Sequence, residues 1–144
     1  DDLALTVLTT PTRPGWGAWY IQGETTLMEA WDVTARSHNH YFLGSVDAWI
    51  QQRVGGLRRT APGWTSFEVS PVVDQRVTSA RISHRTPLGE AAVAWERGPG
   101  GCRFDVTVPP GASATVRDGG QVLHLEPGRH VLTVRGEAAL PDGA

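Results

Sequence analysis

The period of the hydrophobic pattern changes near residue 60, and this change constrains the fold more than any other feature of the sequence. Before it, apolar residues recur every three or four positions, as on one face of an α-helix. After it, apolar and polar residues alternate, most clearly from Cys102 to Val108, where every second side chain is apolar. We therefore expect a mainly β protein with an N-terminal helical segment.

Short alternating runs separated by turns rich in Gly, Pro and Asp fill the chain after residue 60. Runs spaced in this way are typical of an antiparallel β-sandwich. Strands are predicted at residues 65–70, 77–85, 90–96, 102–108, 114–117, 121–125 and 130–135. We place a β-sandwich domain at residues 60–136 and a flexible tail at residues 137–144.

Helical patterns precede the sandwich. The two clearest lie at residues 2–9 and 39–54, where the second is amphipathic and Ser37 or Asn39 is expected to cap it. Their apolar faces consist of Leu3, Val7 and Leu8 in the first helix and of Phe42, Val46, Trp49, Ile50 and Val54 in the second.

Between these two helices the pattern is less regular. Pro11 and Pro14 predict a loop, and Trp16 and Trp19 follow it as local packing or as a sugar-stacking platform. Residues 25–31 fit one or two helical turns, because Thr26 and Glu29 have the spacing of a capping box.

The composition excludes several classes of function. A net charge of −2 gives no electrostatic reason to bind nucleic acid or an anionic membrane. No apolar run reaches the roughly 18 residues of a membrane span. Cys102 is the single cysteine, which excludes an internal disulfide, and no phosphate loop or serine nucleophile motif is present. We expect no cofactor, and the sequence does not indicate where the protein resides.

Residues 23–44 concentrate carboxylates, histidines and aromatic side chains. Carboxylates act as general acid and general base when their environments make their pKa values different, although solvated surface acids are commoner than catalytic ones. Glu29 therefore has two alternative roles, as a solvated surface acid or as the glutamate of the capping box described above. His38 and His40 lack a third ligand at metal-binding spacing, so we expect no metal site. His40 is interpreted as a hydrogen-bond partner for a polar ligand or as a helix-end histidine satisfied by backbone.

Three motifs in this region resemble the end of the catalytic domain of bacterial α-L-rhamnosidases. They are G-x-T-T-L-x-E-x-W from residue 23, N-H-Y-x-L-G-S-V-x-x-W-I from residue 39 and V-G-G-L from residue 54. The resemblance implies that residues 1–59 are the last helices of a truncated (α/α)6 barrel and that a β-sandwich follows. The chain departs from the family at Glu24 and Met28 and in a short loop after Asp32, which puts its sugar preference in doubt.

The resemblance also assigns roles to three residues. Glu29 corresponds to the general base of an inverting hydrolysis that releases terminal α-L-rhamnose, His40 to a sugar-binding histidine, and Trp31 to a residue lining the same pocket. The general acid of the family lies upstream of residue 1. We therefore expect a fragment that is inactive alone and whose partners are a rhamnose-containing glycoside and the rest of the barrel or another chain.

Two other functions are compatible with the sandwich. A carbohydrate-binding module would stack exposed aromatics such as Trp64 or Trp95 on sugar, although Trp95 alternates with apolar residues on an inward face. A purely structural sandwich would bury them. A flat row of exposed aromatics favours binding, and buried aromatics favour a structural role.

Overall fold

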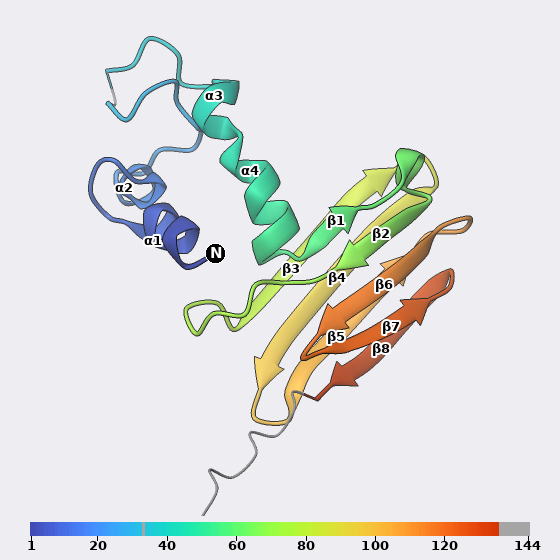
Figure 1. Cartoon of the computed structure of the whole chain (residues 1–144). Helices are drawn as coiled ribbons and strands as arrows, with labels where there is room; N and C mark the ends of the chain where they lie inside the picture. Colours follow the sequence, from blue (N-terminus) through green and yellow to red (C-terminus); the bar gives the residue numbers. More distant parts are fainter. Residues whose placement is uncertain (33, 136–144) are drawn as a thin grey trace, which may run out of the picture. The chain divides into compact units, whose positions relative to one another are not determined.

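A computed structural model describes residues 1–32 and 34–135 (Figure 1). The chain forms two compact units, Asp1–Ile50 and the part that begins at Gln51, and each is described by itself. The first is helical and irregular, and the second consists mainly of strands. The predicted fold class, a mainly β protein with an N-terminal helical segment, is thus confirmed. The tail predicted at residues 137–144 lies outside the described residues.

Helix α1 (Asp2–Thr9) lies where the sequence predicts it but buries a different side chain. Leu5 is 1% exposed, whereas Leu3 is 74% exposed. Apolar residues occupy so many positions of this helix that their spacing alone does not select the buried face. The face is centred on Leu5, and the expectation for Leu3 was wrong.

A second helix, α2 (Trp16–Ile21), follows the loop predicted at Pro11 and Pro14 and was not predicted from the sequence. It ends in a Schellman motif, in which the Gly23 N–H donates to the Tyr20 carbonyl at 3.1 Å. The Glu24 N–H donates to the Trp19 carbonyl at 3.0 Å. Gly23 has a φ of +78°, which costs glycine little and other residues more.

The helical turn predicted at residues 25–31 was wrong, since this segment contains no helix. The Glu29 N–H donates to the Ser37 carbonyl at 3.0 Å, and the Leu27 carbonyl accepts from the His40 N–H at 2.9 Å. These bonds to a later segment replace the bonds of a helix. The capping box therefore does not form, which removes the capping alternative for Glu29.

The helix predicted at residues 39–54 is confirmed in position but is interrupted. It consists of α3 (Tyr41–Gly44), α4 (Val46–Trp49) and a π-helical turn, η1 (Ile50–Val54). Ser45 separates the first two, because its hydroxyl donates to the Phe42 carbonyl at 2.8 Å and competes with the helical bonds.

The start and the apolar face of this helix also differ from expectation. His40 is the N-cap, in place of Ser37 or Asn39, because the chain stays extended through His40 before it turns. Phe42, expected on the apolar face, is 65% exposed. Trp49 is half-buried, as expected.

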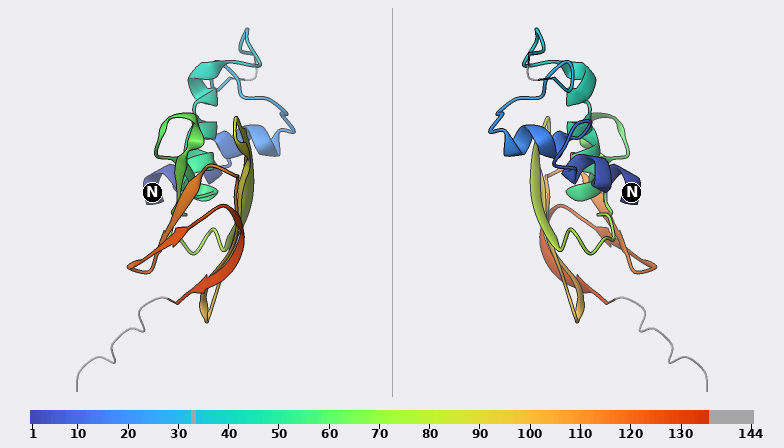
Figure 2. Two further views of the ribbon diagram at one scale, coloured as in Figure 1. Left: turned by 90° about the vertical axis from the view of Figure 1, so that its right-hand side faces the viewer. Right: turned by 90° about the vertical axis from the view of Figure 1, so that its left-hand side faces the viewer.

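Two four-stranded sheets form the second unit (Figure 2). One contains, in spatial order, β1 (Leu57–Arg59), β2 (Ser66–Val69), β6 (Ser113–Asp118) and β7 (Gln121–Leu125). The other contains β3 (Ser79–Thr86), β4 (Gly89–Gly98), β5 (Gly101–Val108) and β8 (Gly128–Val134). All predicted strands are confirmed, and β1 is an additional strand that the sequence analysis missed.

One strand pair departs from the antiparallel expectation. β2 and β6 are parallel, with Phe67 beside Ala114 and Val69 beside Val116. The chain leaves the first sheet after β2, forms β3, β4 and β5 in the other sheet, and returns in the same direction. The other neighbouring strands pair antiparallel.

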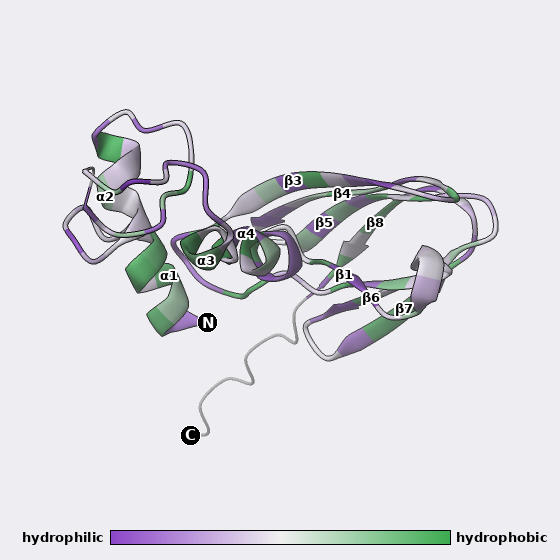
Figure 3. Cartoon of the chain, turned by 90° about the horizontal axis from the view of Figure 1, so that it is seen from above, coloured by the Kyte–Doolittle hydropathy of each residue, from purple (hydrophilic) through white to green (hydrophobic). Residues whose placement is uncertain are grey.

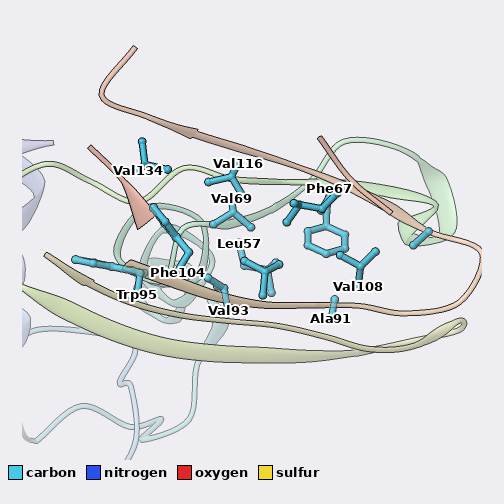
Figure 4. Close-up of a cluster of buried hydrophobic side chains, with 14 of the residues drawn as sticks. Leu57, Phe67, Val69, Ala91, Val93, Trp95, Phe104, Val108, Val116 and Val134 are labelled. Atoms are coloured by element: carbon cyan, nitrogen blue, oxygen red, sulfur yellow. The ribbon is translucent and has the colours of Figure 1, made fainter. Parts of the chain in front are cut away.

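The inner faces of the two sheets form the core. Hydrophilic and hydrophobic residues alternate along the strands (Figure 3), so that one face of each sheet is apolar. In Figure 4, Phe67, Val69 and Val116 of one sheet point toward Ala91 and Val93 of the other. Phe104 is 0% exposed at the centre of β5, which makes it a principal contributor to this core.

A buried ion pair connects the two sheets. Arg97 of β4 donates to both carboxylate oxygens of Asp118 of β6, at 2.9 and 3.2 Å. The Asp118 side chain is 2% exposed, and its hydrogen bonds raise the pKa of Arg97. Burial raises the pKa of the adjacent Cys102 thiol to about 11, so this cysteine is inert at neutral pH.

Phe104→Ala should lower the free energy of unfolding by about 3–5 kcal/mol, because it leaves a cavity between the sheets. Val131→Ala on β8 is the matched control, since Val131 is 55% exposed. We expect it to change the free energy by less than about 0.5 kcal/mol. Urea unfolding measures both, and equal losses would contradict the assignment of the inner face.

Acid should destabilise the sandwich through Glu68. Partial burial raises the pKa of Glu68, but hydrogen bonds from Arg58 and Arg117 outweigh burial and hold it below 4.5. A carboxyl whose pKa is lowered by folding stabilises the fold above its unfolded pKa, and this contribution is lost as the pH falls through the folded pKa. Stability should therefore decrease below about pH 4.5.

Glu68→Gln should make this acid-induced decrease smaller. Urea unfolding at pH values from about 6 to about 3 measures the slope of stability against pH in each variant. An unchanged slope would show that Glu68 does not contribute.

Candidate active site

The two backbone hydrogen bonds from residues 27–29 to residues 37–40 bring Glu29 and His40 to the same end of a loop. Met28, between Leu27 and Glu29, is 0% exposed, so its buried side chain anchors this segment. The Glu29 side chain is half-buried, and its carboxylate has no hydrogen bond or ion pair with the described part of the chain. It is therefore available to a ligand or to water.

The neighbouring carboxylate, Asp32, has a structural role in the same loop. One of its oxygens accepts from both the N–H and the hydroxyl of Thr34, each at 2.9 Å. The other lies 3.3 Å from the Arg13 guanidinium. The Thr34 hydrogen bonds, followed by the Arg13 charge, hold the pKa of Asp32 below its usual value. Asp32 thus differs from Glu29, because its oxygens are already occupied.

Three tryptophans pack together beside this loop. The Trp31 ring meets Trp16 edge-on at 4.9 Å between centroids and lies 5.2 Å from Trp19. The Trp19 indole N–H donates to the Trp31 carbonyl at 3.4 Å. Trp19 is 2% exposed, so its interpretation as local packing is confirmed. Trp31 is half-buried and helps to fix the loop that carries Glu29.

His40 and Tyr41 form a stacked pair at the start of α3. Their ring centroids are 4.8 Å apart with an interplanar angle of 23°. The Nδ1 atom of His40 accepts a hydrogen bond from the Phe42 N–H at 3.2 Å. Both rings line an open hollow of about 840 Å³, together with Asn39, Asp47 and parts of residues 25–27. Glu29 and Trp31 do not line this hollow.

Two contributors to the site were not predicted from the sequence. Asp32 followed by Thr34 has the spacing of an Asx-turn, which is a usable signal for the loop. Tyr41 gives no comparable signal, because its stacking depends on the orientation that the cap gives to the His40 ring. His38 is exposed, and neither it nor any other residue in the described ranges belongs to a group of three side chains suited to a metal ion.

The remaining histidines have local roles in the sandwich. His84 stacks on Trp64 at 4.5 Å between centroids, and His124 bonds to the Thr115 hydroxyl at 3.2 Å. His130 lies 2.8 Å from the Glu126 carbonyl. No helix in residues 1–32 and 34–135 is long and apolar enough to cross a membrane.

Comparison with known proteins identifies both units. Residues 1–54 match the model of the bacterial alpha-L-rhamnosidase 6 hairpin glycosidase domain, and residues 56–130 match that of the bacterial alpha-L-rhamnosidase C-terminal domain. An alpha-L-rhamnosidase of Formosa agariphila is 29% identical over 125 residues, which cover 80% of this chain and 14% of that protein.

Two crystal structures resemble the fold. Native alfa-L-rhamnosidase of Aspergillus terreus has a TM-score of 0.79 at 30% identity, covering 89% of this chain and 16% of that one. Streptomyces avermitilis alpha-L-rhamnosidase complexed with L-rhamnose has a TM-score of 0.82 at 27% identity, covering 93% and 16%.

Helices with a free carboxylate followed by a β-sandwich, together with these matches, define part of a glycoside hydrolase. More specifically, the chain belongs to the bacterial α-L-rhamnosidase family. It spans 14% of the Formosa relative and 16% of each of the two crystallised enzymes. The other segments of those enzymes have no counterpart in these 144 residues.

Trp31→Leu should loosen the loop that carries Glu29, because it removes two aromatic contacts worth about 0.5–1.5 kcal/mol each. We expect the Glu29 and His40 amides to exchange with solvent about tenfold faster or more, as measured by NMR hydrogen exchange. Tyr20→Leu is the control, since Tyr20 is 84% exposed. Unchanged exchange in Trp31→Leu would show that the tryptophans do not hold the loop.

Proposed function

We propose that this chain supplies the general base of an inverting α-L-rhamnosidase and that Glu29 is this base. The observation that carries the proposal is the free carboxylate of Glu29, which lies on a segment tied by backbone hydrogen bonds to the segment that ends in His40. It lies within residues 1–54, which match a glycosidase domain. The relative from Streptomyces avermitilis binds L-rhamnose, which supports rhamnose as the sugar.

In the proposed reaction, the Glu29 carboxylate takes a proton from a water molecule while the water oxygen attacks the anomeric carbon. The bond from this carbon to the glycosidic oxygen breaks, and a carboxylic acid protonates the leaving oxygen. Inverting enzymes place the two carboxyl groups roughly 6.5–9.5 Å apart to leave room for the water. His40 donates a hydrogen bond to the sugar, and Trp31 borders the sugar site.

The general acid is not assigned to this chain. Asp32 is occupied by Thr34 and Arg13, and Glu24 lies on the Schellman turn that ends α2. We propose that the acid lies in another segment of the enzyme, so that the 144-residue chain is inactive alone. Its partners are then a rhamnose-containing glycoside and the remaining helical hairpins, on the same polypeptide or another.

For the sandwich we propose a structural role and not a sugar-binding one. The aromatic residues of this unit are all buried, with Trp64 at 8%, Trp95 at 2%, Phe67 at 1% and Phe104 at 0% exposure. The Trp95 indole N–H is also occupied, since it donates to the Val54 carbonyl at 3.0 Å. The flat row of exposed aromatics typical of a carbohydrate-binding face is therefore absent from the described strands.

Glu29→Gln should lower kcat on p-nitrophenyl α-L-rhamnoside by about 10²–10⁴-fold, the usual contribution of general acid–base catalysis. The assay compares the chain alone with a protein in which the remaining helical hairpins precede it. We expect activity only in the longer protein, and NMR of the first product should show the inverted anomer.

Glu24→Gln is the matched control and should retain activity. Full activity of Glu29→Gln in the longer protein would contradict the base assignment. Turnover by the short chain would contradict the placement of the acid in another segment.

A further inference from the structure

The N-cap of α3 determines which nitrogen of His40 carries a hydrogen. Nδ1 accepts from the Phe42 N–H at 3.2 Å, and a ring nitrogen that accepts a hydrogen bond carries no hydrogen itself. In the neutral imidazole the hydrogen is therefore on Nε2. No acceptor in the described part of the chain receives this N–H, which leaves it for a ligand.

Tyr41 fixes the plane of the same ring. Its ring lies on the imidazole at 4.8 Å between centroids and 23° between planes. Tyr41 is 83% exposed, so little else in this unit holds its side chain. The hydrogen bond to Nδ1 and the stacking contact together restrict rotation of the imidazole, and both rings border the same open hollow.

We propose that Tyr41 is a positioning residue for sugar recognition, which acts by holding the capped His40 ring so that its Nε2–H meets an acceptor oxygen of the ligand. This inference rests on the proposed function, in which His40 contacts the sugar. It adds that the recognised ligand atom offers a lone pair to His40, as a hydroxyl or ring oxygen does, and that the selectivity originates in the helix cap.

The first test uses the 144-residue chain and does not depend on activity. Long-range ¹H–¹⁵N NMR of the imidazoles above about pH 8, where histidine is neutral, reports which nitrogen carries the hydrogen. His40→Asn assigns the signal. We expect hydrogen on Nε2 and ring-current shifts on the His40 ring protons that Tyr41→Phe keeps and Tyr41→Leu abolishes. Hydrogen on Nδ1, or shifts unaffected by Tyr41→Leu, would overturn the proposal.

The second test is a double-mutant cycle in the longer protein, read as kcat and KM on p-nitrophenyl α-L-rhamnoside. Tyr41→Leu should raise KM about tenfold with a smaller change in kcat, because it weakens binding of the sugar, and Tyr41→Phe should stay within about twofold. On the His40→Asn background, Tyr41→Leu should cost nothing further, since it acts through His40.

An equal cost of Tyr41→Leu on both backgrounds would overturn the proposal, because Tyr41 would then act without His40. The test of Glu29 by Glu29→Gln is independent of these tests of Tyr41. If that variant keeps full activity, the base assignment fails, whereas the NMR result and the cycle still test the role of Tyr41.

Discussion

The candidate site depends on the pairing of two segments that themselves lie outside helices and strands. The Leu27 carbonyl and the Glu29 N–H bond to His40 and Ser37, and these bonds close the base of a loop. Without them, Glu29 would lie on a flexible connection and His40 would have no fixed position before α3. A catalytic carboxylate needs a defined position, because small displacements from the reacting atoms cost much of the rate. The Asx-turn at Asp32 and the tryptophan cluster then stabilise the two sides of the same loop.

The sandwich could be predicted closely because its signal is local. The alternation of apolar and polar residues along β5 indicates that the segment is a strand and also which of its faces is buried. The turns between strands are rich in Gly and Pro. β1 was missed because three residues, Leu57–Arg59, are too short for a period to be recognised. The parallel pairing of β2 with β6 could not be predicted either, since it depends on where the chain returns after three strands in the other sheet.

The site was harder to predict because non-local bonds override local preference there. The Thr-x-x-Glu spacing that ends at Glu29 favours a helical cap, yet the Glu29 N–H donates to the Ser37 carbonyl. Helix α2 was missed because its six residues are too few for a clear period and the burial of Trp19 depends on contact with Trp31. Even the cap of α3 is a histidine, which is not among the preferred capping residues. Two of these deviations, at Glu29 and at His40, lie at candidate site residues.

The two units differ in whether their ionisable side chains are paired. In the sandwich, ionisable groups near the core are paired, as Arg97 and Asp118 are, so they stabilise the fold and offer little to a ligand. In the first unit, neither the Glu29 carboxylate nor the Nε2 of His40 has a partner within the described chain, and His40 lines an open hollow. An enzyme gains most from such groups when water is excluded and fixed dipoles surround them. A hollow this open does not exclude water. We therefore expect the enclosure that such chemistry needs, like the general acid, to be contributed by other segments of the enzyme.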